Sequence, residues 1–63
     1  MKLINDYLRE TGIKKYIFAQ QLGISVGSLY LITSGERKIT RQQALAMEGL
    51  TKGKLKAEEL LRE

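Results

Sequence analysis

The chain has 63 residues, with neither cysteine nor histidine. A domain this small buries a modest share of its surface, and many such domains rely on disulfides or a metal ion. Without those residues we expect no metal, no cofactor and no disulfide, so stability must come from tight helix packing and self-association. The lack of cysteine fits a reducing compartment, and we expect one cytoplasmic domain over residues 1–63.

Eleven lysines and arginines outweigh seven acidic residues and give a formal net charge of +4. A basic surface attracts polyanions such as nucleic acid. No apolar run exceeds four residues, so we expect neither a signal peptide nor a membrane span. A catalytic role is not expected, because no credible nucleophile–base pair is present and so short a chain leaves little room for a small-molecule pocket.

Six glycines and no proline punctuate the chain. Helices commonly end at a glycine, so we expect an all-α domain, a small bundle of four to five helices. The first is predicted at Leu3–Thr11, ending at Gly12. Its apolar stripe comprises Leu3, Ile4, Tyr7 and Leu8.

The second helix is predicted at Lys15–Leu22, ending at Gly23, with Phe18, Ala19 and Leu22 on one face. The third begins after the N-cap Ser25 and ends near Ser34 and Gly35. It turns Leu29 and Ile32 inward.

The fourth helix starts at Thr40, which forms a capping box with Gln43. Its apolar residues Ala44, Met47 and Leu50 follow at intervals of three. A last short helix covers about Lys56–Arg62, with Leu60 or Leu61 facing inward. No strong strand signal is present, although Lys54-Leu55 is a candidate for a brief extended segment.

The stretch from Lys15 to Gly35 is the most informative part of the chain. Two helices joined by a tight turn need a small residue where they meet, here Ala19, and a residue that tolerates positive φ, here Gly23. Apolar residues that lock the crossing angle are Leu22, Ile24, Leu29 and Ile32. At these spacings the features are fairly specific for a helix-turn-helix over residues 15–34.

This stretch resembles the helix-turn-helix of phage Cro and repressor proteins, the broad XRE class. The closest resemblance is to short Cro-like regulators related to the YdaS antitoxins, and it covers nearly the whole chain. It extends through Gly35-Glu36-Arg37-Lys38, Ala44-Leu45-Ala46-Met47-Glu48 and the tail Lys52-Gly53-Lys54-Leu55-Lys56-Ala57-Glu58-Glu59-Leu60.

The resemblance implies a transcriptional regulator, a repressor that binds operator DNA with its third helix in the major groove, and a homodimer at least on DNA. Carried over by position, the base-contacting residues are Ser25, Val26, Gly27, Ser28, Tyr30, Leu31 and Ser34. The phosphate-contacting residues are Lys15, Arg37, Lys38 and Arg41. Candidate dimer contacts are Gly49–Leu61, Tyr16 and Ile17.

The expected recognition face carries no Arg, Asn or Gln, so base readout would rest on Ser and Tyr hydroxyls and on apolar contacts with thymine methyl groups. Because Leu29 and Ile32 point inward, the apolar side chains of Val26, Tyr30 and Leu31 point elsewhere. They contact either DNA or another protein. The alternative function is therefore a protein-interaction module, for example an antitoxin-like partner-binding protein, built on the same scaffold.

Overall fold

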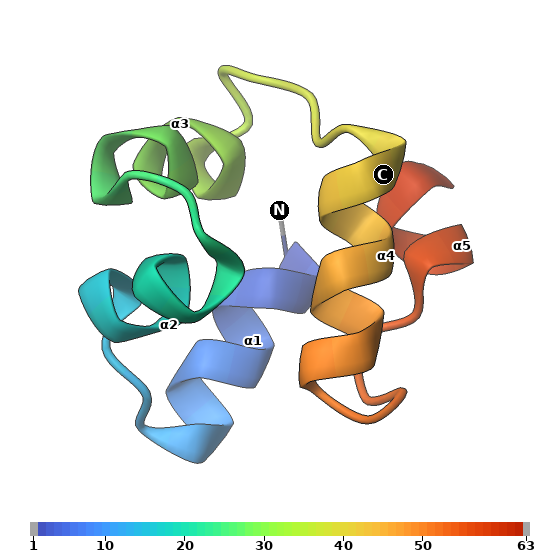
Figure 1. Cartoon of the computed structure of the whole chain (residues 1–63), viewed down its shortest axis with the longest axis horizontal. Coiled ribbons are helices and arrows are strands. Elements are labelled where there is room, and N and C mark those ends of the chain that lie inside the picture. The colour runs from blue at the N-terminus through green and yellow to red at the C-terminus, as the bar shows by residue number, and fades with distance from the viewer. Residues whose placement is uncertain (1, 63) are drawn as a thin grey trace.

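The computed structural model describes residues 2–62, and within them the chain forms five α-helices and no strand (Figure 1). The helices are α1 (Lys2–Thr11), α2 (Lys15–Leu22), α3 (Val26–Ser34), α4 (Arg41–Leu50) and α5 (Ala57–Arg62). The expected all-α class and small helical bundle are confirmed. None of these helices is long and apolar enough to cross a membrane.

Local signals set most helix ends. Gly23 and Gly35 follow α2 and α3 with φ of 76° and 87°, a left-handed conformation that favours glycine. The predicted capping box is present: the Thr40 hydroxyl accepts from the Gln43 N–H, and the Gln43 side chain accepts from the Thr40 N–H. Gly27 and Gly49 do not end helices but lie inside α3 and α4.

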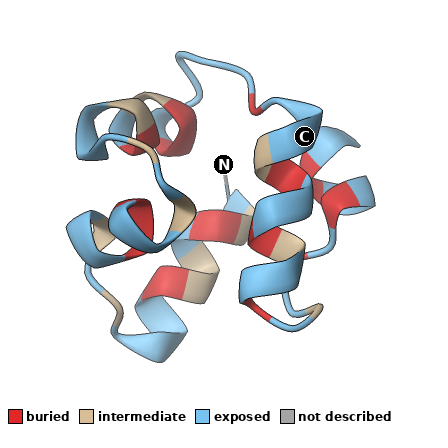
Figure 2. Cartoon of the chain, in the orientation of Figure 1, coloured by how far each residue is buried: buried red, intermediate tan, exposed pale blue. Residues whose placement is uncertain are grey.

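The core lies where the five helices meet (Figure 2). Its fully buried large side chains are Phe18, Ile4, Leu29, Ile32, Met47 and Leu60. Phe18 from α2 packs against Tyr7 from α1, with ring centroids 5.8 Å apart. The expected core residues Ala19, Leu29 and Ile32 are buried, whereas Leu22 and Ile24 pack partly buried against the cluster.

Of the apolar residues that follow at intervals of three in α4, Ala44 and Met47 are buried, whereas Leu50 is 39% exposed. The inner face of α4 runs from Ala44 and Met47 to Thr51, which is only 4% exposed and occupies the position one turn beyond Met47. The candidate extended segment at Lys54-Leu55 is not extended, because these residues form a bend.

A side chain from α4 caps the N-terminus of α5. The last helix starts at Ala57, one residue later than expected, and has no Ser or Thr cap. Instead, Glu48 Oε1 accepts a hydrogen bond from the Ala57 N–H at 2.9 Å. Within α5, Leu60 is the inward residue at 1% exposure, and Leu61 is 45% exposed. The Glu48 carboxylate also lies at the N-terminal, positive end of the α5 helix dipole, where an anion is favoured.

The buried hydroxyl of Thr51 holds the turn between α4 and α5. It donates to the Met47 carbonyl at 2.7 Å and accepts from the Leu55 N–H at 3.0 Å. Thr51→Val keeps the shape but leaves the buried Leu55 N–H unpaired, so we expect a loss of about 1–3 kcal/mol of unfolding free energy. Urea denaturation followed by circular dichroism measures it.

Thr11→Val is the matched control, because the Thr11 hydroxyl makes a similar bond to the Tyr7 carbonyl in an exposed position. Its expected loss is within about 0.5 kcal/mol. Equal losses for the two variants would show that the Thr51 hydroxyl does not hold the turn.

Candidate nucleic-acid interface

The inner surface of α3 is fixed by burial and by one long-range hydrogen bond. Leu29 and Ile32 are fully buried, and Thr33 is 4% exposed. Asn5 Nδ2 in α1 donates to the Thr33 carbonyl at 3.2 Å. Together these contacts fix the rotation of α3 about its axis, so the opposite side of the helix must face solvent.

That opposite side carries the predicted base-contacting residues. Val26 and Tyr30 are 39% and 54% exposed, and both lie on one face because they are four residues apart. Gly27 and Ser34 are also exposed, whereas Ser28 and Leu31 are half-buried at the edges. We call this surface, from Val26 to Ser34, the outer face of α3.

Lys15, the first residue of α2, reaches across to this outer face. Its Nζ lies 4.6 Å from the centroid of the Tyr30 ring, which is a cation–π contact. The predicted phosphate-contacting Lys15 and the predicted base-contacting Tyr30 are therefore neighbours in space. The contact orders an exposed aromatic ring and holds a positive charge beside it.

A hydroxyl network marks the start of α3. Ser25 caps the helix by accepting from the Ser28 N–H at 3.1 Å, and it donates to Ser28 Oγ at 3.0 Å. Arg37, from the loop after α3, donates through Nη1 to the same Ser28 oxygen at 3.1 Å. Sequence reasoning placed Arg37 among the loop cations, but its guanidinium lies against the first turn of α3.

The end of α3 has a different character. Ser34 Oγ lies 3.0 Å from Glu36 Oε2 and 3.1 Å from the Leu31 carbonyl oxygen, so its single O–H is directed within the protein. Sequence reasoning did not select Glu36. The only available signal was an acidic residue just beyond the helix-ending glycine. The outer face of α3 is thus positive near its start and negative at its end.

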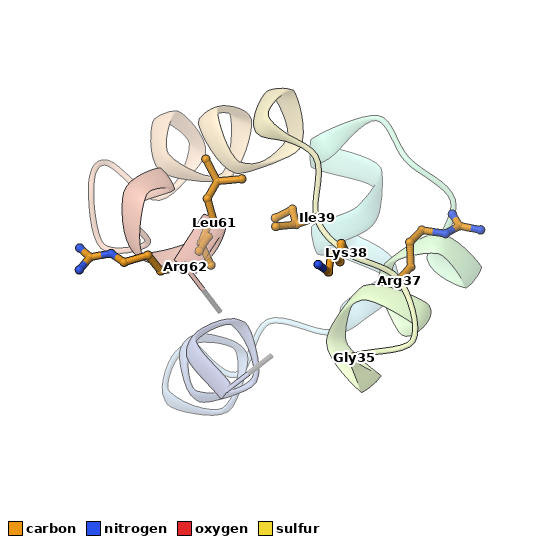
Figure 3. A pocket seen from close by; sticks show the side chains of 7 residues that line it. Gly35, Arg37, Lys38, Ile39, Leu61 and Arg62 are labelled. Atoms are coloured by element: carbon orange, nitrogen blue, oxygen red, sulfur yellow. The ribbon is translucent and has the colours of Figure 1, made fainter.

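The remaining predicted cations, Lys38 and Arg41, are exposed but lie apart. Lys38 lines a hollow between the loop after α3 and α5 (Figure 3). The same picture shows the Arg37 side chain directed away from the Leu61 and Arg62 side chains. Arg41 instead lines a hollow between α4 and α5. The four predicted phosphate contacts therefore do not form a single cluster.

Comparison with known proteins finds no match to this chain. No protein-family model matches the chain, and neither a curated protein nor a solved structure matches it.

The orientation of α3 predicts a sharp contrast between neighbouring residues. Tyr30→Ala removes an exposed ring and its cation–π contact, so we expect a loss of at most about 1 kcal/mol of unfolding free energy. Leu29→Ala removes a fully buried side chain, and we expect a loss of about 2–5 kcal/mol. Urea denaturation curves for the two variants measure the contrast. Similar losses would mean that the outer face of α3 is buried in solution.

Proposed function

We propose that this protein is a sequence-specific DNA-binding transcriptional regulator, a Cro-like repressor that binds operator DNA in the major groove through α3. The observation that carries the proposal is the outer face of α3, whose exposed Tyr30 lies beside the ammonium group of Lys15 while the guanidinium of Arg37 lies against Ser28. The major groove admits an α-helix. The proposal includes a cytoplasmic location.

The proposal divides the side chains by chemistry. Tyr30 offers a hydroxyl to base edges, and Val26 and Leu31 offer apolar contact to thymine methyl groups. Lys15 and Lys38 supply charge to the phosphates, which position the helix and contribute much of the affinity. The start of α3 faces the DNA more favourably than its end, because Glu36 lies at the end and repels phosphate.

Salt dependence tests this proposal. A site is selected from random duplex DNA, and its dissociation constant is measured between about 50 and 200 mM salt, where phosphate contacts weaken steeply. We expect the logarithm of affinity to fall by about 0.9 per phosphate contact for each tenfold rise in salt. Lys38→Ala should reduce this slope by about 1 per bound chain. Lys54→Ala is the control for this change in slope. It also removes one positive charge, but from the turn that follows α4.

Tyr30→Ala should weaken binding to the selected site more than binding to random DNA. If the unaltered protein binds no DNA even at low salt, the alternative gains: the apolar outer face of α3 then serves a protein-interaction module. Protein association through that face would change little with salt, because it would not release phosphate counterions.

The proposed regulator acts as a homodimer, and we place the contact between copies on α4 and α5 rather than on Tyr16 or Ile17. A hollow between these two helices contains two exposed leucines, Leu45 and Leu61, at 55% and 45% exposure. Its other lining residues are Arg41, Glu48, Ala57 and Glu58. Exposed apolar surface flanked by charges is typical of protein interfaces.

The charges in this hollow support pairing with a second copy. Arg41 and Glu48 lie two helical turns apart on the same side of α4, with Leu45 between them. In a two-fold interface each patch meets itself in reverse. Antiparallel α4 helices would therefore place Arg41 of each copy beside Glu48 of the other, with the two Leu45 side chains in the middle.

This arrangement leaves α3 free for DNA. In Figure 1, α3 and α5 lie at opposite sides of a molecule that measures 24 × 23 × 20 Å. Two copies joined through α4 and α5 would carry their α3 helices at the outer ends of the dimer. A half-site separation of about 34 Å, one turn of DNA, is the spacing that such dimers need.

The dimer surface is tested by Leu45→Glu, which adds an acidic group beside Glu48 and Glu58. We expect light scattering after gel filtration to show two chains for the unaltered protein and one for the variant. Leu50→Glu is the matched control, because Leu50 is also exposed on α4 but does not line the hollow. A single-chain mass for the unaltered protein at all concentrations, or equal dissociation by both variants, would contradict this surface.

A further inference from the structure

The guanidinium at the first turn of α3 belongs to Arg37, a residue of the loop that follows the helix. The helix sequence VGSLYLITS contains no Arg, Asn or Gln, the side chains that most often recognise bases in pairs of hydrogen bonds. Arg37 nevertheless places its Nη1 atom 3.1 Å from Ser28 Oγ, nine residues earlier in the chain. A cation from the loop thus lies against the first turn of the helix, beside Ser28.

The path of Arg37 is fixed at both ends. Its backbone N–H donates to the Leu31 carbonyl at 3.1 Å, so the side chain begins beside the second half of α3. The guanidinium then reaches back along the helix to Ser28. Two anchors make this placement more specific than that of an unattached surface arginine, because less side-chain freedom is lost when a ligand binds.

The Ser28 hydroxyl is left with one defined role. It accepts from Ser25 Oγ at 3.0 Å and from Arg37 at 3.1 Å. A hydroxyl has two acceptor lone pairs and one hydrogen to donate. With both lone pairs occupied, the hydrogen of Ser28 remains to be donated.

The charge of Arg37 is also available. The ion pairs within residues 2–62 join Arg9 to Asp6 and Arg62 to Glu58, and neither involves Arg37. Its guanidinium has five N–H donors, and one of them is used on Ser28. The remaining donors form a planar fork, which matches two adjacent acceptors.

We propose that Arg37 reads a guanine in the major groove under the first turn of α3, with Ser28 as the positioning residue that holds the guanidinium there. Guanine offers two neighbouring acceptors, O6 and N7, on its major-groove edge, and a guanidinium donates to both. This inference rests on the proposed DNA-binding function and names one base that the operator must contain. The competing role for Arg37 is a phosphate contact without base preference.

Position-by-position specificity separates the two roles. A site is selected from random duplex DNA, and affinity is measured for all four bases at each position with the unaltered protein and with Arg37→Lys. Lysine keeps the charge but loses the planar fork. We expect the unaltered protein to prefer one G·C pair in each half-site by about 5- to 150-fold, and Arg37→Lys to lose most of that preference. Lys38→Ala, the matched control, should weaken all sequences by a similar factor.

Replacing that guanine by 7-deazaguanine removes the N7 acceptor and keeps the base pair. The unaltered protein should then bind several-fold more weakly, and Arg37→Lys should show little change. Ser28→Ala should lower the same preference, and Ser28→Thr, which keeps a hydroxyl, should restore it. This rescue distinguishes a positioning role from a general effect on the helix.

The outcomes separate this inference from the function on which it rests. If the unaltered protein binds DNA selectively but Arg37→Lys weakens all sequences equally, Arg37 is a phosphate contact and the inference is overturned while the proposed function stands. Selective binding that is insensitive to 7-deazaguanine at every guanine would overturn it in the same way. If the unaltered protein binds no DNA, both fall together.

Discussion

The burial of one side of α3 is the constraint on which the candidate interface depends. Leu29 and Ile32 have no exposed surface, and each such side chain contributes about 1.5–3 kcal/mol when it is fully buried. Rotating α3 about its axis would expose both, so burial and the Asn5 bond to the Thr33 carbonyl fix one orientation. The outward position of Tyr30 is a consequence of that orientation. The chemistry of the outer face of α3 is therefore set indirectly, by the buried residues on the opposite side of the helix.

The sequence predicted the helices well because their boundaries depend on local contacts. A capping residue such as Ser25 or Thr40 acts within its own turn, and Gly23 acts through its own backbone angles. The starts of the first, fourth and last helices each differed by one residue. These helix boundaries were predicted from residue type and from the spacing of residues along the chain, which are visible without a structure.

The features that the sequence could not predict are contacts between residues far apart in the chain. The Glu48 cap of α5 spans nine residues, and so does the Arg37 bond to Ser28. In neither pair does the sequence indicate which residue will be the hydrogen-bond partner. Intervals of three drift around a helix that turns every 3.6 residues, so Leu50 is 39% exposed and the buried position of the next turn is Thr51. For the candidate site, the outer face of α3 was predictable, but the position of Arg37 upon it was not.

Residue Glu48 connects the stability of the domain to its proposed assembly. Its carboxylate caps the N-terminus of α5, a helix of six residues that is too short to be stable alone. The same residue lines the hollow proposed to meet a second copy. Covering that hollow would shield the Ala57 bond from water and bury Leu61, so association would stabilise α5 as well as pair the chains. Because any contact made only by the folded state adds stability by mass action, the small core of one chain need not carry the whole fold.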